Sequence, residues 1–280
     1  MSYKLIKDRY FATLGWTNRE NASDAKVAFM NDVDMTSAIR LREKYTDLKP
    51  SYTALLARAI ALAIREHPKA NRMVLALPFY KRIVQFDAIN ITIAIEQQQK
   101  DASKDTVLAD TVYHVDQKSL SDIMVQLHEM ARATPENNPR QRQLAFIVEK
   151  LPNWLALLLI SIPRWFPGMW VQHRGGSVLI SSPCKYGVER LVANWSWPIG
   201  FSFGLLRKQP VVVADEVVVR PVMSVTMSFD RRVLLGAPAA RFFKRVCDLL
   251  ENAEETLDMD SPATPAMQEG RNAAAREDVA

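Results

Sequence analysis

Residues 208–251 read KQPVVVADEVVVRPVMSVTMSFDRRVLLGAPAARFFKRVCDLLE, and this stretch decides the fold class. It opens with two valine-rich runs that flank the short turn Ala214–Glu216, which is the pattern of a β-hairpin. A further strand is predicted at 222–229. From Ala237 to about Leu257 the apolar residues recur at helical spacing, so an amphipathic helix follows the strands. Paired strands followed by a core-facing helix indicate an α/β protein.

The rest of the chain also mixes helical and strand patterns. Ser119-Leu-Ser-Asp122 has the spacing of a capping box and opens a helix that Pro135 ends. Glycines 175 and 176 separate the helical patterns before them from a mainly strand-like region after them. The predicted helices are 35–47 and 51–67, and the predicted strands are 88–97, 177–182 and 199–206.

Composition describes an ordinary globular chain of 280 residues, 48% apolar and 24% charged. No glycine occurs between Gly15 and Gly168, which excludes a glycine-rich phosphate loop in that range. Two distant thiols, Cys184 and Cys247, are typical neither of a disulfide framework nor of a zinc site. The N-terminal sequence lacks the apolar run of a secretion signal, so we expect a cytoplasmic protein. Residues 258–280 are expected to form a flexible tail after a single domain, 1–257.

The charge is unevenly distributed along the chain. The net charge is +5, but residues 1–257 hold 34 basic against 26 acidic side chains. A basic body favours phosphate groups as ligands, on a coenzyme or a lipid surface, although the charge could equally serve solubility. No aromatic-and-basic stripe of the kind that binds single strands occurs, so nucleic acid is not expected as a partner.

Four stretches together resemble one protein family. They are NDVDMTSAIRLREKY (31–45), YTALLARAIALAIREHPKAN (52–71), GGSVLISSPCKYG (175–187) and the opening stretch 208–251. In this order they resemble the catalytic core of the dihydrolipoamide acyltransferases of 2-oxo acid dehydrogenase complexes, a relative of chloramphenicol acetyltransferase. The resemblance implies a chloramphenicol acetyltransferase-like two-layer sandwich, a mixed sheet flanked by helices. It also implies a homotrimer with active sites between subunits, which moves an acyl group between coenzyme A and a second thiol or hydroxyl.

The resemblance also implies a site, and the chain departs from it. The family's general base is a histidine in a DHRxxDG-like motif, and its oxyanion donor is a Ser or Thr at a strand end. Here the motif reads SFDRRVLLG (228–236), so Arg231 stands where the base would be and Leu235 where its orienting acid would be. A guanidinium cannot accept a proton at neutral pH. Ser181 keeps the position of the oxyanion donor, so we expect a site with a charge-stabilising group and no inherited base.

Two interpretations follow from this departure. The protein could be a catalytically silent binding or scaffolding trimer, a pseudoenzyme. Alternatively another group has replaced the base, and His173 is the first candidate and His114 the second. His67 and His128 are interpreted as capping or surface residues.

Three further side chains are candidates for substrate binding. Arg231 could hold a phosphate or carboxylate, or could pair with an acid such as Asp230 or Glu189. Trp195 and Trp197 stand where the family's chain passes the substrate tunnel, and core packing is the alternative for both.

The resemblance extends to cofactors and partners. A coenzyme A thioester is expected as a possible substrate and no metal is expected. Because no lipoyl-bearing domain or linker precedes residue 5, we also expect no lipoyl group and no swinging arm within this polypeptide. Trimers, or larger assemblies of trimers, are the expected oligomer.

Residues 151–174, LPNWLALLLISIPRWFPGMWVQHR, form an apolar insertion longer than the family's usual connection. Its uninterrupted apolar core, 154–162, is too short to span a bilayer, which takes about 20 residues. Pro163 and Pro167 predict a bent, re-entrant shape. Three roles remain open: packing or oligomer contact, lining of an acyl pocket, or a peripheral membrane contact in which tryptophans and arginines meet lipid headgroups.

Overall fold

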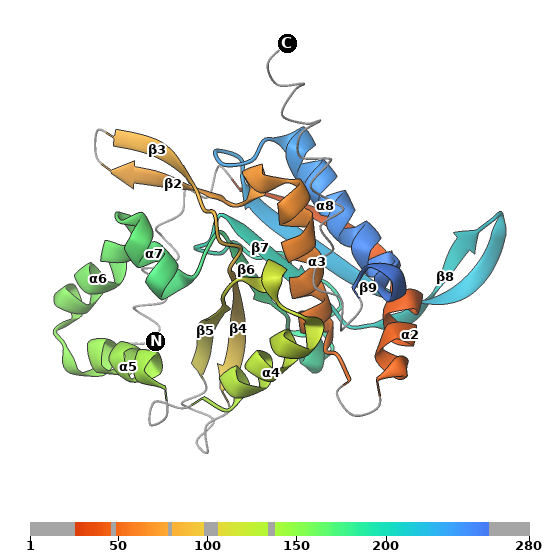
Figure 1. Cartoon of the computed structure of the whole chain (residues 1–280), viewed down its shortest axis with the longest axis horizontal. Coiled ribbons are helices and arrows are strands. Elements are labelled where there is room, and N and C mark those ends of the chain that lie inside the picture. Colours follow the sequence, from red (N-terminus) through yellow and green to blue (C-terminus); the bar gives the residue numbers. More distant parts are fainter. Residues whose placement is uncertain (1–25, 46–48, 78–79, 98–105, 134–137, 258–280) are drawn as a thin grey trace, which may run out of the picture.

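The computed structural model describes residues 26–45, 49–77, 80–97, 106–133 and 138–257. Their centre is a seven-stranded sheet in the order β1-β9-β7-β6-β4-β5, with β8 paired to β9 (Figure 1). β4, β6 and β7 run parallel to one another, and the other pairs are antiparallel. The strands are β1 (Lys26–Asp34), β4 (Ile91–Gln97), β5 (Thr106–Val112), β6 (Val178–Ser181), β7 (Ile199–Phe203), β8 (Arg207–Val213) and β9 (Glu216–Asp230).

Helices pack against this sheet and form the second layer (Figure 1). α3 is the central helix, because residues from Ala54 to Ile64 are all buried. Its first turn is capped by Ser51, whose hydroxyl accepts a hydrogen bond from the N–H of Ala54. The layer consists of α2 (Thr36–Lys44), α3 (Tyr52–Glu66), α4 (Leu120–Ala131), α8 (Gly236–Glu251) and α9 (Ala253–Thr256). The predicted mixed sheet flanked by helices is therefore confirmed.

β9 differs from the sequence prediction in one informative way. The runs around Pro221 were expected as two strands, but they form one strand of 15 residues. Pro221 lies where β9 changes partners: the residues before it pair only with β8, and from Val222 onward they pair with β1. A proline is tolerated there because it lies one residue beyond the end of the β1 ladder, so no hydrogen bond of that ladder needs its N–H. The Pro221 carbonyl instead accepts from the N–H of Met35.

Some of the other elements match the prediction from the sequence, and some carry no sequence signal. Ser119 and Asp122 form the predicted capping box of α4. The predicted helix 237–257 divides into α8 and α9 at Asn252. The elements not expected from the sequence include β1 and the strands of a separate hairpin, β2 (Arg72–Leu77) and β3 (Tyr80–Gln85).

The apolar insertion has the expected bent shape. α6 (Asn153–Ser161) ends in a short 3-10 turn that contains Pro163, and α7 (Pro167–Arg174) begins at its proline. The two segments meet at 109°. An additional helix, α5 (Pro139–Lys150), precedes them, and all three lie to one side of the sheet (Figure 1). In the described ranges no single helix is long and apolar enough to cross a membrane, although the bent pair passes that test jointly by length and composition.

Candidate active site

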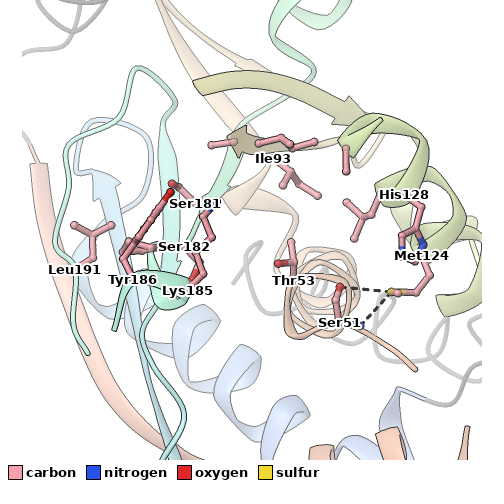
Figure 2. Close-up of a pocket in the computed structure, with 15 residues that line it drawn as sticks. Ser51, Thr53, Ile93, Met124, His128, Ser181, Ser182, Lys185, Tyr186 and Leu191 are labelled. Atoms are coloured by element: carbon pink, nitrogen blue, oxygen red, sulfur yellow. Dashed lines mark hydrogen bonds between the residues drawn. The ribbon is translucent and has the colours of Figure 1, made fainter. Parts of the chain in front are cut away.

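Ser181 lies at the carboxyl end of β6, at the edge of a pocket of about 490 Å³ (Figure 2). The strand that carries it is buried through Val178, Leu179 and Ile180, and it emerges at this residue. Because β4, β6 and β7 are parallel, their carboxyl ends meet at the same edge of the sheet. The pocket is lined by Ser51, Thr53, Ile93, Ala94, Ile95, Met124, Leu127, His128, Ala131, Ser181, Ser182, Pro183, Lys185, Tyr186 and Leu191.

The walls of this pocket are fixed by hydrogen bonds around Ser181. The Ser182 hydroxyl donates to the Phe203 carbonyl at 2.7 Å and accepts from the N–H of Cys184, which holds the turn after β6. On the opposite wall the Met124 sulfur accepts from the backbone N–H of Ser51 at 3.1 Å (Figure 2). The Ser181 side chain is therefore presented by a rigid strand end rather than by a free loop.

A second polar cluster surrounds Asp230, the last residue of β9. Asp230 is buried, and Arg232 donates to both of its carboxylate oxygens, the shortest contact being Nη2 to Oδ2 at 2.6 Å. Although burial opposes ionisation, these hydrogen bonds and the charge of Arg232 hold the Asp230 pKa below its usual value. Lys26, the β1 residue that pairs with Asp230, donates its ammonium to the Trp197 carbonyl at 2.7 Å. Burial lowers the pKa of Lys26 to about 8.

Arg231 is exposed beside this cluster and makes no ion pair within the described part of the chain. The two acids considered as its partners are taken by others, because Asp230 pairs with Arg232 and Glu189 pairs with Arg207. Leu235 is exposed too, at the start of α8. The cation at the position of the family's base therefore points its charge to solvent in this protomer.

Ser181 and Arg231 lie at opposite ends of the sheet. Ser181 is level with Ser202 on β7, which is level with Thr226 on β9. Arg231 is five residues beyond Thr226, roughly 16 Å along the strand, and two strand spacings, about 10 Å, separate β6 from β9. A thioester carbon cannot touch both side chains within one protomer.

The candidate histidines do not gather at Ser181. His173 is exposed at the end of α7, before the buried start of β6, and His114 is exposed in a left-handed turn after β5. Neither lines the pocket. His67 caps α3 as interpreted from the sequence, with its backbone N–H bonded to the Ala63 carbonyl. His128 shares the pocket with Ser181, from α4 (Figure 2), and no sequence spacing links the two.

Trp195 and Trp197 both make packing contacts. The Trp195 ring covers Gly200 of β7 so closely that a Cβ there would lie 2.0 Å from it. The Trp197 indole N–H donates to the Arg174 carbonyl at 2.8 Å, and its ring packs edge-on against Trp170. Neither tryptophan is part of the lining of the Ser181 pocket, and Trp197 lies at the Asp230 end of the sheet, where its carbonyl accepts from Lys26. No cluster of metal-ligating side chains occurs among the residues described.

The described chain therefore combines a mixed sheet covered by helices with a serine at the end of a central parallel strand, beside a pocket. The sequence model of the 2-oxoacid dehydrogenase acyltransferase catalytic domain matches residues 18–145 and 171–257. The chain therefore belongs to the 2-oxoacid dehydrogenase acyltransferase family. The match leaves out residues 146–170, which overlap the apolar insertion.

Individual relatives are distant in sequence. The chain is 24% identical over 242 residues to a mitochondrial dihydrolipoyllysine-residue succinyltransferase component of Arabidopsis thaliana, covering 83% of this chain and 44% of that protein. It is 22% identical over 228 residues to the dihydrolipoyllysine-residue acetyltransferase component of Zymomonas mobilis, covering 79% of this chain and 43% of that protein. The chain thus spans less than half the length of these relatives.

Solved structures agree on the fold. A probable dihydrolipoamide acetyltransferase of Listeria monocytogenes superposes with a TM-score of 0.65 at 20% identity, over 94% of this chain and 99% of that one. The Azotobacter vinelandii dihydrolipoamide acetyltransferase, whose catalytic serine, histidine and asparagine have been investigated, gives 0.65 at 23% identity, over 92% and 94%. The cubic core of a pyruvate dehydrogenase multienzyme complex gives 0.66 at 22% identity, over 92% and 94%.

One sequence-based prediction is wrong. We expected no lipoyl group, but the relatives are named for a dihydrolipoyllysine residue, so a lipoyl group belongs to the family's reaction. The prediction took the start of this chain as evidence. That inference fails physically, because a lipoyl group carried by another polypeptide can reach the same site.

Proposed function

We propose that the protein transfers an acyl group between a coenzyme A thioester and the thiol of a dihydrolipoyl group. The observation that carries this proposal is the rigid presentation of Ser181 at the pocket edge, in a chain of the acyltransferase family. The acceptor thiol is suggested by the relatives, which are named for dihydrolipoyllysine.

The reaction needs few groups from the protein. The acceptor thiol loses its proton, its sulfur attacks the thioester carbonyl carbon, and the carbonyl oxygen becomes an oxyanion that accepts a hydrogen bond from Ser181. The intermediate collapses, the bond to the coenzyme sulfur breaks, and that thiolate takes up a proton. A hydroxyl placed on such an oxyanion contributes roughly 10²–10³ in rate.

This protein departs from its family in the step that removes the proton from the acceptor thiol. With Arg231 at the base position, the thiol must ionise without that base, and a thiol of pKa about 8.5 is only a few per cent thiolate at neutral pH. Loss of a positioned base costs about 10²–10⁴ in rate. We therefore propose a slow transferase whose rate rises with pH toward the acceptor pKa.

Arg231 has a different role in this proposal: it binds a phosphate or carboxylate of the substrate through its guanidinium. Its exposure and the absence of a described ion pair support this role. In the Azotobacter protein the investigated histidine and asparagine are four residues apart, as Arg231 and Leu235 are here.

The active form is proposed to be a homotrimer whose sites lie between protomers. The distance between Ser181 and Arg231 supports this, because the thioester carbon can contact both side chains only if they come from different copies. The structural relatives include the core of a multienzyme complex, which is consistent with larger assemblies of trimers. We propose a cytoplasmic location.

The test combines acetyl- and succinyl-coenzyme A with dihydrolipoamide and follows release of free coenzyme A. Ser181→Ala should lower kcat by about 10²–10³. Ser121→Ala, which removes a hydroxyl on α4 outside the pocket lining, is the matched control and should leave the rate unchanged. Equal turnover by the wild-type chain and Ser181→Ala would refute the mechanism.

A non-catalytic assembly or binding protein is the second candidate, favoured by Arg231 and Leu235 at the two altered positions. It predicts no turnover with any thioester. It also predicts that Arg231→His combined with Leu235→Asp leaves the biological role intact. Loss of that role on Ser181→Ala alone would contradict it.

A further inference from the structure

The apolar insertion is the part of the described chain that the acyltransferase family does not account for. The family match stops at residue 145 and resumes at 171. Between these points the chain forms the end of α5, all of α6 and the start of α7, to one side of the sheet (Figure 1). Of the three helices, only α6 lies wholly outside the family match, and its surface needs its own explanation.

α6 has no polar face. Its nine residues read NWLALLLIS, so apolar side chains point in every direction, yet only Ala156 is buried. A helix that is apolar all round is normally enclosed by protein or by lipid. Here Trp154 is 69% exposed and Leu158 is exposed as well. Phe166, at the bend before α7, is 55% exposed and continues this surface.

This surface is held in place rather than left to collapse. Arg174 is buried, and its guanidinium donates to the Ile160 carbonyl near the end of α6. The same guanidinium lies 5.0 Å from the centre of the Trp170 ring. The Trp170 indole donates to the Gly176 carbonyl at 2.8 Å, just before β6. These contacts tie the bent pair to the central sheet, so the exposed rings keep a defined orientation.

Either a second copy of the chain or a lipid surface could cover these apolar side chains. The charge of the segment favours the lipid surface. Residues 139–174 contain five basic side chains and a single acid, Glu149. Of the basic residues, Lys150 is exposed at the end of α5, and Arg164 is half-buried at the bend. A two-fold contact with a second copy would bring two such positive segments together, which opposes that association. An anionic lipid surface complements them, because its negative potential attracts Lys and Arg side chains near the surface.

We propose that α6 and the start of α7 dock on an anionic lipid surface. The rings of Trp154 and Phe166 enter the boundary between headgroups and acyl chains, and Lys150 and Arg164 remain at headgroup level. The segment lies in the surface and does not cross it: nine helical residues reach about 14 Å, whereas the hydrocarbon core is about 30 Å thick. The 109° bend agrees with this placement. The inference does not depend on acyl transfer.

The experiment measures co-sedimentation of the full chain with two kinds of vesicle, phosphatidylcholine alone and phosphatidylcholine mixed with an equal amount of phosphatidylglycerol. The wild-type chain should bind the mixed vesicles, and added salt should weaken the binding. Trp154→Glu with Phe166→Glu should reduce affinity at least about tenfold, because both apolar rings are removed from the contact. Val125→Glu is the matched control, since Val125 is also exposed on a helix, α4, outside the insertion.

Several results would overturn the proposal. The wild-type chain could fail to bind mixed vesicles, or the double variant could bind as well as the control. A change of sedimentation coefficient in the double variant without vesicles, absent in Val125→Glu, would show that a second copy covers the surface instead. If the double variant does not fold, quenching of wild-type tryptophan fluorescence by brominated phosphatidylglycerol decides the matter, because undiminished fluorescence on these vesicles would exclude insertion of the rings.

Discussion

Arg58 shows how one residue can hold a connection that carries no sequence signal. Its side chain leaves the centre of α3 and is 2% exposed. One guanidinium nitrogen donates to three carbonyls, those of Val115, Asp116 and Lys118, which form the link between β5 and α4. A helical pattern predicts that position 58 lies in a helix, but not that a cation there binds a segment almost sixty residues away.

Arg58→Ala should therefore lower the free energy of unfolding by about 2–4 kcal/mol. The substitution leaves one buried and two partly buried carbonyls without this donor and removes the packing of a long side chain. Urea denaturation followed by far-UV circular dichroism measures the change. Arg72→Ala is the control, because Arg72 makes an exposed hydrogen bond to Gln85, and it should change stability by less than about 0.5 kcal/mol. Equal effects of the two substitutions would contradict the role of Arg58.

The partly buried ammonium of Lys26 should make the free energy of unfolding rise with pH in mildly alkaline solution. Its pKa is lowered by burial from 10.5 to about 8. Between these values the unfolded chain holds a proton that the folded chain has released, so the free energy of unfolding increases with pH. Lys26→Met should flatten this rise, whereas Lys208→Met, at an exposed lysine on β8, should not. Urea midpoints across the window measure it, and identical pH profiles for Lys26→Met and the wild type would contradict the assignment.

Cys247 should lower the stability of the fold as pH rises, which is opposite to the effect of Lys26. Burial raises the pKa of its thiol from 9.0 to about 12. In that range the folded chain keeps a proton that the unfolded chain loses, so stability falls as pH rises. The comparison for Lys26 is therefore clearest near the lower end of its window, before Cys247 titrates.

Elements with strong local signals were predictable, and elements that depend on distant partners were not. The capping box at Ser119 and the alternating isoleucines of β4 mark their elements with neighbouring residues. β1 has no such mark: its alternation is weak, and it is a strand because all nine of its residues pair with β9. The continuity of β9 through Pro221 likewise depends on where β8 ends and β1 begins.

The β8–β9 hairpin carries a second exposed apolar face, at the far end of the sheet from the insertion (Figure 1). Val212 and Val217 are directly opposite each other in the ladder, and Val219 continues the same face because side chains alternate along a strand. Val217 is 73% and Val219 67% exposed. Valines that a single protomer leaves uncovered on an extended arm are suited to contact with a neighbouring copy.

Val217→Lys with Val219→Lys should dissociate the proposed trimer into monomers, because two desolvated charges oppose the contact. Sedimentation velocity measures the result. Glu216→Lys adds a lysine on the opposite face of the same strand and is the control, which should remain assembled. A wild-type chain that sediments as a monomer, or a double variant that remains trimeric, would contradict this role of the hairpin.

For the whole molecule, the fold could be predicted from the sequence while the assembly of the site could not. Ser181 and Arg231 were singled out by motif position, which says nothing of the distance between them. That distance follows from strand order and register, which place the two residues at opposite edges of the sheet. His128 was interpreted as a surface residue for the same reason: only the packing of α4 beside β4 brings it to the pocket of Ser181.

Ser181 and Arg231 lie far apart in one protomer, so a site shared between two protomers can be tested by combining two defective variants. Ser181→Ala removes the oxyanion donor, and Arg231→Glu reverses the charge proposed to bind substrate, so each variant alone should be nearly inactive. If each site takes its serine from one protomer and its arginine from the next, random co-assembly leaves about a quarter of the sites with both native residues. Co-expressed variants should then recover about a quarter of wild-type turnover with acyl-coenzyme A and dihydrolipoamide. Variants purified separately and mixed under conditions that prevent subunit exchange are the control and should stay inactive. No recovery on co-expression would mean that each site lies within one protomer, because no protomer in the mixture carries both native residues.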